Sequence, residues 1–198
     1  MNAERWRESA GPWLGRLARY LDRWGIHPNV ITVLGFLLSL GAGGLAGLDL
    51  RWGAALLWMF GGLCDALDGA LARVSGKASP AGAFLDSTLD RYSDAAVLLG
   101  MGAAWQRAGT AWGGWIAGIA LLGALMVSYT RARGEGLGIS LREGLFTRLE
   151  RFLLVLIALL TGWYGPLLIL FAILAHLTVL QRAWQAMRML SSPERHPL

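Results

Sequence analysis

Charged side chains are scarce in this sequence of 198 residues. They make up 16% of it, against 55% hydrophobic residues, and the mean hydropathy is +0.48. A soluble domain of this size rarely has such a composition, because about a quarter of its residues are normally charged. The shortage of charge therefore predicts a protein surrounded by a lipid bilayer.

Cysteine is scarcer still, and the single Cys64 cannot form an internal disulfide. The first 25 residues lack both a continuous apolar stretch and a small-residue cleavage site, so no secretory signal is visible. The three histidines, at positions 27, 176 and 196, share no spacing suggestive of a metal site. Because no secretory signal is visible, we expect the N-terminus to stay in the cytoplasm.

A net charge of +5 and a pI near 10.1 could indicate a nucleic-acid partner. The basic residues, however, are scattered between apolar runs instead of gathering on one soluble domain. Anionic lipid and phosphorylated substrates fit this pattern better, and no nucleic-acid partner is expected.

Long apolar runs fill most of the chain. A membrane-spanning helix needs about 20 mostly apolar residues. Six such spans are predicted, over residues 29–48, 53–73, 83–106, 110–131, 145–162 and 164–187. Short links separate them, which favours helical hairpins and leaves no room for a soluble domain. The expected fold is an all-α integral membrane protein with one domain over residues 1–198, comprising a bundle at 29–187 and a cytoplasmic tail at 188–198.

The distribution of positive charge predicts the orientation. All but two of the 18 Lys and Arg residues, Arg51 and Arg107, fall on one side of the predicted bundle. Because positive charge resists translocation, both termini should be cytoplasmic. We expect a multi-pass protein of the cell membrane whose active site faces the cytoplasm.

Residues 1–25 are predicted to form an amphipathic helix in the membrane interface. Apolar residues recur at helical spacing on one face, and arginines occupy the other: the apolar set is Trp13, Leu14, Leu17, Tyr20, Leu21 and Trp24, and the basic set is Arg16, Arg19 and Arg23. A soluble helix packed on another domain is the alternative, but no other domain exists.

Two pairs of acidic residues interrupt the apolar runs. Asp65 and Asp68 lie three residues apart near the end of the second predicted span, and Asp86 and Asp90 lie four apart at the start of the third. Each pair shares one helical face, so four carboxylates can converge. One or two divalent cations would compensate their repulsion, and all-oxygen ligands select Mg²⁺ or Mn²⁺.

Small residues and a cation follow the first acidic pair. Gly69 and Ala72 share the helical face of Asp65 and leave space for a ligand against the backbone. Arg73 would be unfavourable beside a metal unless it faced more negative charge, such as a pyrophosphate. The site is therefore predicted to take a phosphorylated ligand.

The stretch DALDGALARVSGKASPAGAFLDSTLD, residues 65–90, resembles the signature D-x2-D-G-x2-A-R-x8-G-x3-D-x3-D of the CDP-alcohol phosphotransferases. All fixed positions match: Asp65, Asp68, Gly69, Ala72, Arg73, Gly82, Asp86 and Asp90. The six-span layout with an interfacial helix also resembles that family, whose members commonly form homodimers. The resemblance implies an enzyme that moves a phosphoryl-linked group from a CDP-activated lipid to an alcohol.

The resemblance also implies site roles. Asp65, Asp68 and Asp86 would bind two metal ions together with Asp90, which would also be the general base. The CDP-lipid donor would contact two segments of the chain, comprising Pro28, Asn29, Val30, Ile31 and Thr32 with Gly69, Ala72, Arg73 and Ser79.

The acceptor is indicated by residues outside the signature. The segments SYTRARGEGLG at 128–138, TRLER at 147–151 and DSTLDRYSD at 86–94 resemble phosphatidylinositol-phosphate and archaetidylinositol-phosphate synthases. The implied reaction transfers the phosphatidyl group of CDP-diacylglycerol to inositol 1-phosphate. Its phosphate would lie among Ser128, Arg131, Arg148, Arg151 and Arg182.

Several alternatives stay open on the residues alone. The acceptor could be glycerol 3-phosphate or another alcohol, and the donor could carry an archaeal-type lipid or be CDP-inositol. The aspartates could line the path of a cation transporter or channel, or pair with arginines for packing, although their spacing with Gly69, Ala72 and Arg73 favours the enzyme. Asp94 is interpreted as a structural partner. Each cytoplasmic arginine could simply be an orientation signal.

Overall fold

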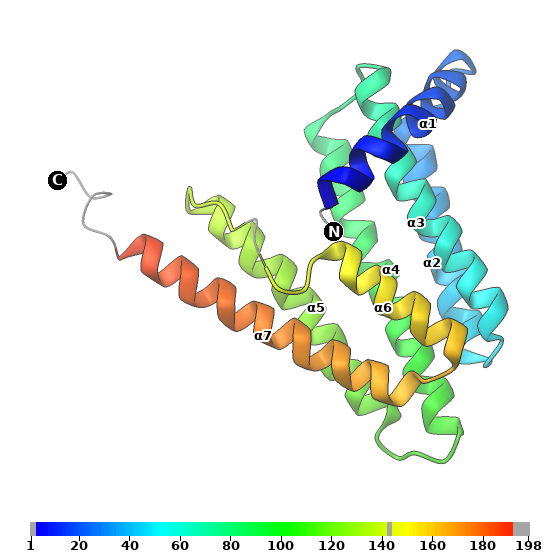
Figure 1. Ribbon diagram of the computed structural model, residues 1–198, viewed down its shortest axis with the longest axis vertical. Coiled ribbons are helices and arrows are strands. Elements are labelled where there is room, and N and C mark those ends of the chain that lie inside the picture. The colour runs from blue at the N-terminus through cyan, green and yellow to red at the C-terminus, as the bar shows by residue number, and fades with distance from the viewer. Residues whose placement is uncertain (1–2, 142–143, 192–198) are drawn as a thin grey trace.

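The computed structural model describes residues 3–141 and 144–191, which form seven α-helices and no strand (Figure 1). The helices are α1 (Ala3–Arg23), α2 (Pro28–Gly47), α3 (Arg51–Val74), α4 (Pro80–Arg107), α5 (Gly113–Gly136), α6 (Arg148–Thr161) and α7 (Tyr164–Leu190). The prediction of an all-helical chain is confirmed, and each predicted span falls on one helix. Arg142, Arg195 and residues 192–198 of the predicted tail lie outside the described residues.

Local sequence explains where the helices begin and end. Proline occupies the first position of α2 and of α4, where its missing N–H costs nothing. The ring of His27 accepts a hydrogen bond from the Asn29 amide at 3.2 Å, and the Ser79 hydroxyl accepts one from the Gly82 amide at 3.1 Å. At the C-terminal end of α6, Gly162 adopts the left-handed backbone conformation, which ends the helix.

Four of the helices, α2, α3, α5 and α7, are long and apolar enough to cross a bilayer. The helix α4 has 28 residues but includes the acidic residues of the signature, and α6 has only 14 residues. Length and composition thus describe a multi-pass membrane protein with fewer clear spans than the six predicted. The helix α6 is shorter than the predicted span at 145–162, because residues 145–147 precede the helix.

Helices α2, α3 and α4 pack together, while α5 and α7 run side by side and extend away from them (Figure 1). Small residues let α2 and α4 approach closely. A Cβ atom on Gly43 would lie 2.4 Å from the Ala96 carbonyl oxygen, and one on Gly100 would lie 2.1 Å from the Gly43 carbonyl oxygen. Because this contact is backbone against backbone, only glycine fits there. The register that it sets carries the α4 aspartates to the level of those on α3.

The helix α1 lies across one end of the α2–α4 group (Figure 1). Its Leu14, Leu17 and Leu21 pack on an apolar cluster that includes Leu67 and Leu71 of α3. The aromatic members of its predicted apolar face, Trp13, Tyr20 and Trp24, remain 54%, 55% and 71% exposed. The single face predicted from the sequence is therefore divided, because α3 covers the aliphatic side chains and leaves the aromatic ones outside.

The α2–α4 contact generates a stability prediction. Gly43→Ala should lower the thermal unfolding midpoint of the purified protein in detergent, because overpacking of this kind costs about 1–3 kcal/mol. The control is Gly44→Ala in the same helix, where an added Cβ meets nothing within 4 Å. Equal midpoints for the two variants, measured by tryptophan fluorescence, would show that the contact is not tight.

Candidate active site

The carboxylates of α3 and α4 converge. Asp65, Asp68 and Asp86 each offer an oxygen atom, and these atoms all lie within 4.8 Å of one another. The i, i+3 spacing on α3 and the turn between the two helices bring them together. The structure thus forms a three-carboxylate cluster from three of the four aspartates that the sequence singled out.

The cluster is suited to a divalent cation. Asp68 is 6% exposed, and its Oδ2 atom is buried without a hydrogen-bond partner among the described residues. A buried carboxylate oxygen without a partner is costly, so this atom calls for a positive ligand. Because every donor is a hard oxygen, the residues fit Mg²⁺ or Mn²⁺.

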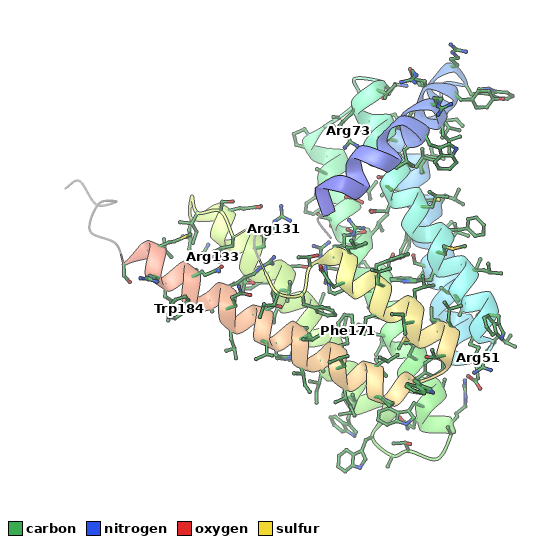
Figure 2. The ribbon with its side chains drawn as sticks, in the orientation of Figure 1. Arg51, Arg73, Arg131, Arg133, Phe171 and Trp184 are labelled. Atoms are coloured by element: carbon green, nitrogen blue, oxygen red, sulfur yellow. The ribbon has the colours of Figure 1, made fainter. Side chains whose placement is uncertain are left out.

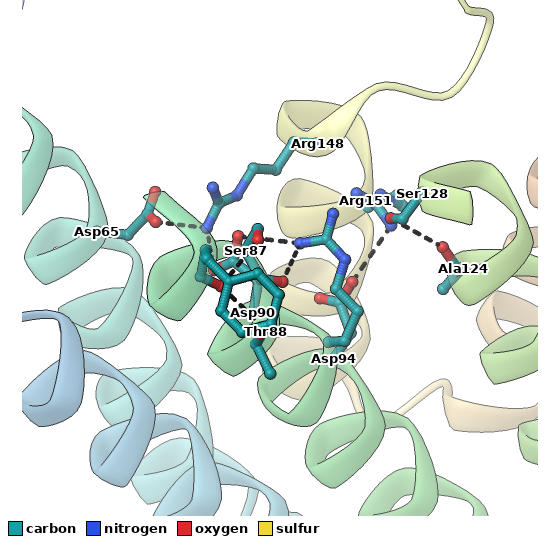
Figure 3. A network of polar contacts seen from close by, with 11 residues as sticks. Asp65, Ser87, Thr88, Asp90, Asp94, Ala124, Ser128, Arg148 and Arg151 are labelled. Atoms are coloured by element: carbon teal, nitrogen blue, oxygen red, sulfur yellow. Dashed lines mark hydrogen bonds and ion pairs between the residues drawn. The ribbon is translucent and has the colours of Figure 1, made fainter. Parts of the chain in front are cut away.

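The fourth aspartate, Asp90, lies outside that cluster and binds guanidinium groups. One nitrogen of Arg148, Nη2, donates to Asp65 Oδ1 and to Asp90 Oδ1, both at 2.5 Å (Figure 3). Arg91 Nη1 lies 3.3 Å from Asp90 Oδ2. Arg148 therefore links the cluster to Asp90 across three helices.

The start of α6 holds Arg148 in position. Thr147 and Glu150 form a reciprocal capping box, with Glu150 accepting from both the Thr147 amide and the Thr147 hydroxyl. One turn further on, the Phe152 ring stacks on Trp58 of α3 with centroids 5.5 Å apart, and Trp58 Nε1 donates to the Phe152 carbonyl at 3.2 Å. These contacts fix the α6 N-terminus beside the acidic residues of α3.

Two other arginines of the predicted acceptor site are buried. Arg151 is 9% exposed and donates to Asp94 Oδ2 at 3.2 Å, which agrees with the structural role predicted for Asp94. Arg182, on α7, is 5% exposed and donates to the Val127 carbonyl at 2.6 Å. Both guanidinium groups are therefore fixed by the protein fold.

The two remaining members lie on α5. Arg131 is exposed and forms an ion pair with Glu135 at 3.0 Å, one helical turn away. The Ser128 hydroxyl donates to the Ala124 carbonyl at 3.3 Å (Figure 3). Arg131 and Arg151 lie near enough to Arg182 for their charges to act on it. Three arginines from three helices thus form one positive region, whereas Arg148 binds the aspartates.

The residues predicted to bind the donor surround the helix ends next to the cluster. A Cβ on Gly82 would lie 3.2 Å from Asn29 Oδ1, so the N-termini of α2 and α4 touch. Thr32 is buried, and its hydroxyl lies within hydrogen-bonding reach of the Asp68 carboxylate. On α3, the exposed Arg73 extends back over Gly69, whose added Cβ would lie 3.4 Å from Arg73 Nη1.

The remaining predicted donor residues differ in exposure. Pro28 is buried, and Ile31 belongs to the apolar cluster beneath α1. Val30, by contrast, is 58% exposed, and Ala72 is partly buried. Figure 2 shows Arg73 at the end of the molecule opposite to Arg51.

Sequence reasoning did not assign a site role to Arg91 or to the capping box. Arg91 directly follows Asp90, and neighbouring positions on a helix point to different faces, so spacing gave no signal. The capping box did have a signal, because Thr147 followed three residues later by Glu150 is the expected pattern before an apolar run.

These features define an α-helical membrane protein with a carboxylate cluster suited to a divalent metal. A family model described as CDP-alcohol phosphatidyltransferase matches residues 25–184. The chain belongs to this family, as the signature predicted, and is therefore an enzyme.

Individual relatives and solved structures support the assignment to this family. A protein from Pyrococcus horikoshii, named archaetidylinositol phosphate synthase, is 40% identical over 182 residues, covering 89% of this chain and 92% of the relative. The Mycobacterium tuberculosis phosphatidylinositol phosphate synthase (PgsA1), solved with CDP-DAG bound, superposes with a TM-score of 0.81 at 29% identity, covering 91% and 94% of the two chains. A second structure of PgsA1, in complex with manganese and citrate, gives 0.80 at 30% identity, covering 91% and 90%.

The unpartnered Asp68 oxygen generates a test of the metal site. Asp68→Asn should weaken Mn²⁺ binding by at least about tenfold, because a neutral amide replaces a charged ligand in a buried site. Binding can be measured by Mn²⁺ paramagnetic resonance on the purified protein. The control is Asp49→Asn, a matched change in the turn that precedes α3. Unchanged Mn²⁺ affinity in Asp68→Asn would exclude this carboxylate as a ligand.

Proposed function

We propose that this protein transfers the phosphatidyl group of CDP-diacylglycerol to the hydroxyl of inositol 1-phosphate, releasing CMP and forming phosphatidylinositol phosphate in phospholipid biosynthesis. The observation that carries the proposal is the carboxylate cluster formed by signature residues of α3 and α4, with Arg148 of α6 hydrogen-bonded to its member Asp65. The relatives named as archaetidylinositol and phosphatidylinositol phosphate synthases support the same acceptor.

Asp65, Asp68 and Asp86 would hold the divalent ions together with Asp90, and Mg²⁺ or Mn²⁺ would supply neutralisation of the pyrophosphate charge. Asp90 would accept the proton of the attacking hydroxyl. The new bond joins the acceptor oxygen to the phosphorus atom of the phosphatidyl group. The bond from that phosphorus to the CMP oxygen breaks, and CMP leaves with its electron pair.

The donor would bind next to the cluster, at the N-termini of α2 and α4 and the C-terminal part of α3. Pro28 to Thr32, Gly69, Ala72, Arg73 and Ser79 form this proposed site. The nearness of Asn29 to Gly82 and of Thr32 to Asp68 supports it, because both join the α2 N-terminus to the signature helices. Arg73 has the reach and exposure to pair with a pyrophosphate oxygen.

The acceptor phosphate would lie among Ser128, Arg131, Arg148, Arg151 and Arg182. An inositol phosphate brings about two negative charges, which several guanidinium groups can neutralise. The nearness of Arg131 and Arg151 to Arg182 supports this assignment, because it concentrates positive charge in one region.

The proposed topology has six spans, α2 to α7, with both termini in the cytoplasm, α1 in the interface and the active site at the cytoplasmic surface of the cell membrane. The 14 residues of α6 extend about 21 Å, short of the roughly 30 Å of hydrocarbon, so its N-terminus would lie inside the membrane boundary. The exposed aromatic residues of α1 support its interfacial position. Family resemblance supports a homodimer, and residues 1–198 would form one domain.

The acceptor is tested by measuring CMP release from CDP-diacylglycerol with a series of alcohols. We expect release with inositol 1-phosphate, and release that depends on Mg²⁺ or Mn²⁺. Release with glycerol 3-phosphate alone would instead identify a phosphatidylglycerophosphate synthase. Metal flux into reconstituted vesicles without any CMP release would identify a transporter.

The role of Asp90 is tested in the same assay. Asp90→Asn should lower the rate by about 100-fold or more, because it removes the group that takes the hydroxyl proton. Asp49→Asn, in the turn that precedes α3, should keep the wild-type rate. A rate for Asp90→Asn within threefold of the wild type would exclude Asp90 as the general base.

A further inference from the structure

Arg148 has two possible partners in this protein. In the proposed function Arg148 binds the acceptor phosphate. In the structure, however, its Nη2 atom donates hydrogen bonds to Asp65 and Asp90, at 2.5 Å each. A phosphate next to those carboxylates would be repelled by them while Arg148 neutralises them. Arg148 can therefore bind the acceptor phosphate favourably only when another cation neutralises Asp65 and Asp90 in its place.

The charges around the site point to what that other cation is. With all four aspartates ionised, Arg148 and Arg91 balance the equivalent of two carboxylates. The remaining charge matches one divalent ion, and the cluster of Asp65, Asp68 and Asp86 is built to hold one. Removing Arg148 from Asp65 and Asp90 leaves those two carboxylates short of positive charge, which a second divalent ion would supply.

Resting on the proposed function, we propose that Arg148 is an internal substitute for the second metal ion and is a positioning residue for the acceptor. In the structure its guanidinium bridges Asp65 and Asp90. Arg148 would leave these carboxylates when a second divalent ion is held there together with the pyrophosphate donor, and it would then bind the acceptor phosphate. The displacement links occupation of the donor site to formation of the acceptor site.

The exposure of Arg148 is compatible with this exchange. Its side chain is 51% exposed, against 19% for that of Asp90, so the guanidinium can leave without opening the core. The buried Arg151, three residues further along α6, stays bound to Asp94 and keeps the helix in place. Only one side chain has to move between its two partners.

The test is a Mn²⁺ titration of the purified protein without substrates. The wild type should bind one ion tightly and a second weakly. Arg148→Gln should bind the second ion at least about tenfold more tightly, an effect within the usual range of coupling between sites. Arg133→Gln, an exposed arginine of α5 outside the proposed donor and acceptor sites, is the charge control and should change the affinity for the second ion by less than threefold.

Unchanged or weaker binding of the second ion by Arg148→Gln would overturn the proposal. Arg148→Lys provides the same test if the glutamine variant does not fold, because one ammonium group is a poorer bridge and should also tighten the second ion. Arg148→Gln should raise the KM for inositol 1-phosphate as well, and tighter metal binding with an unchanged KM would overturn the transfer to the acceptor. A wild type that uses only glycerol 3-phosphate would refute the proposed acceptor while leaving the titration interpretable.

Discussion

Negative charge concentrated at one depth of a lipid-embedded helix bundle has to be matched by positive charge at the same depth. Asp65, Asp68, Asp86 and Asp90 create this requirement, and Asp94 extends it by one turn. Each carboxylate alone would be costly there, so the surrounding helices supply arginines. The paths of α4 and α6 follow from this need, because the ion pairs of Arg148 and Arg151 join the two helices.

The carboxylates can meet only because the helices that carry them come close together. Gly43 and Gly100 remove the side chains that would keep α2 and α4 apart, and Gly82 does the same near Asn29. In lipid, where burying apolar surface gives little driving force, such backbone contacts supply much of the packing energy. The small residues thus act on the active site from a distance, by setting the register of α4.

Much of this arrangement could be predicted from the sequence. Apolar runs located all six helices after α1. Bilayer thickness did not predict the length of every helix, because α6 has only 14 residues. Helical spacing placed Asp65 and Asp68 on one face of α3, because residues three apart share a face. The addition of Asp86 to the cluster depends on how α4 packs beside α3. The partners of Arg148 could not be predicted, because Asp65 and Asp90 lie 83 and 58 residues away in the chain. Contacts at such separations depend on packing angles that periodicity does not contain.

The two ion pairs between α4 and α6 differ in a way that matters for catalysis. Asp94 with Arg151 lies one turn deeper than Asp90 with Arg148, and the Arg151 side chain is only 11% exposed. A buried pair of this kind is hard to break, because separating it leaves an uncompensated charge. Stacking of Phe152 on Trp58 adds a second attachment, from α6 to α3. These two contacts hold the first turns of α6 in place. Arg148, the first residue of the helix, can therefore exchange partners without a movement of the helix backbone.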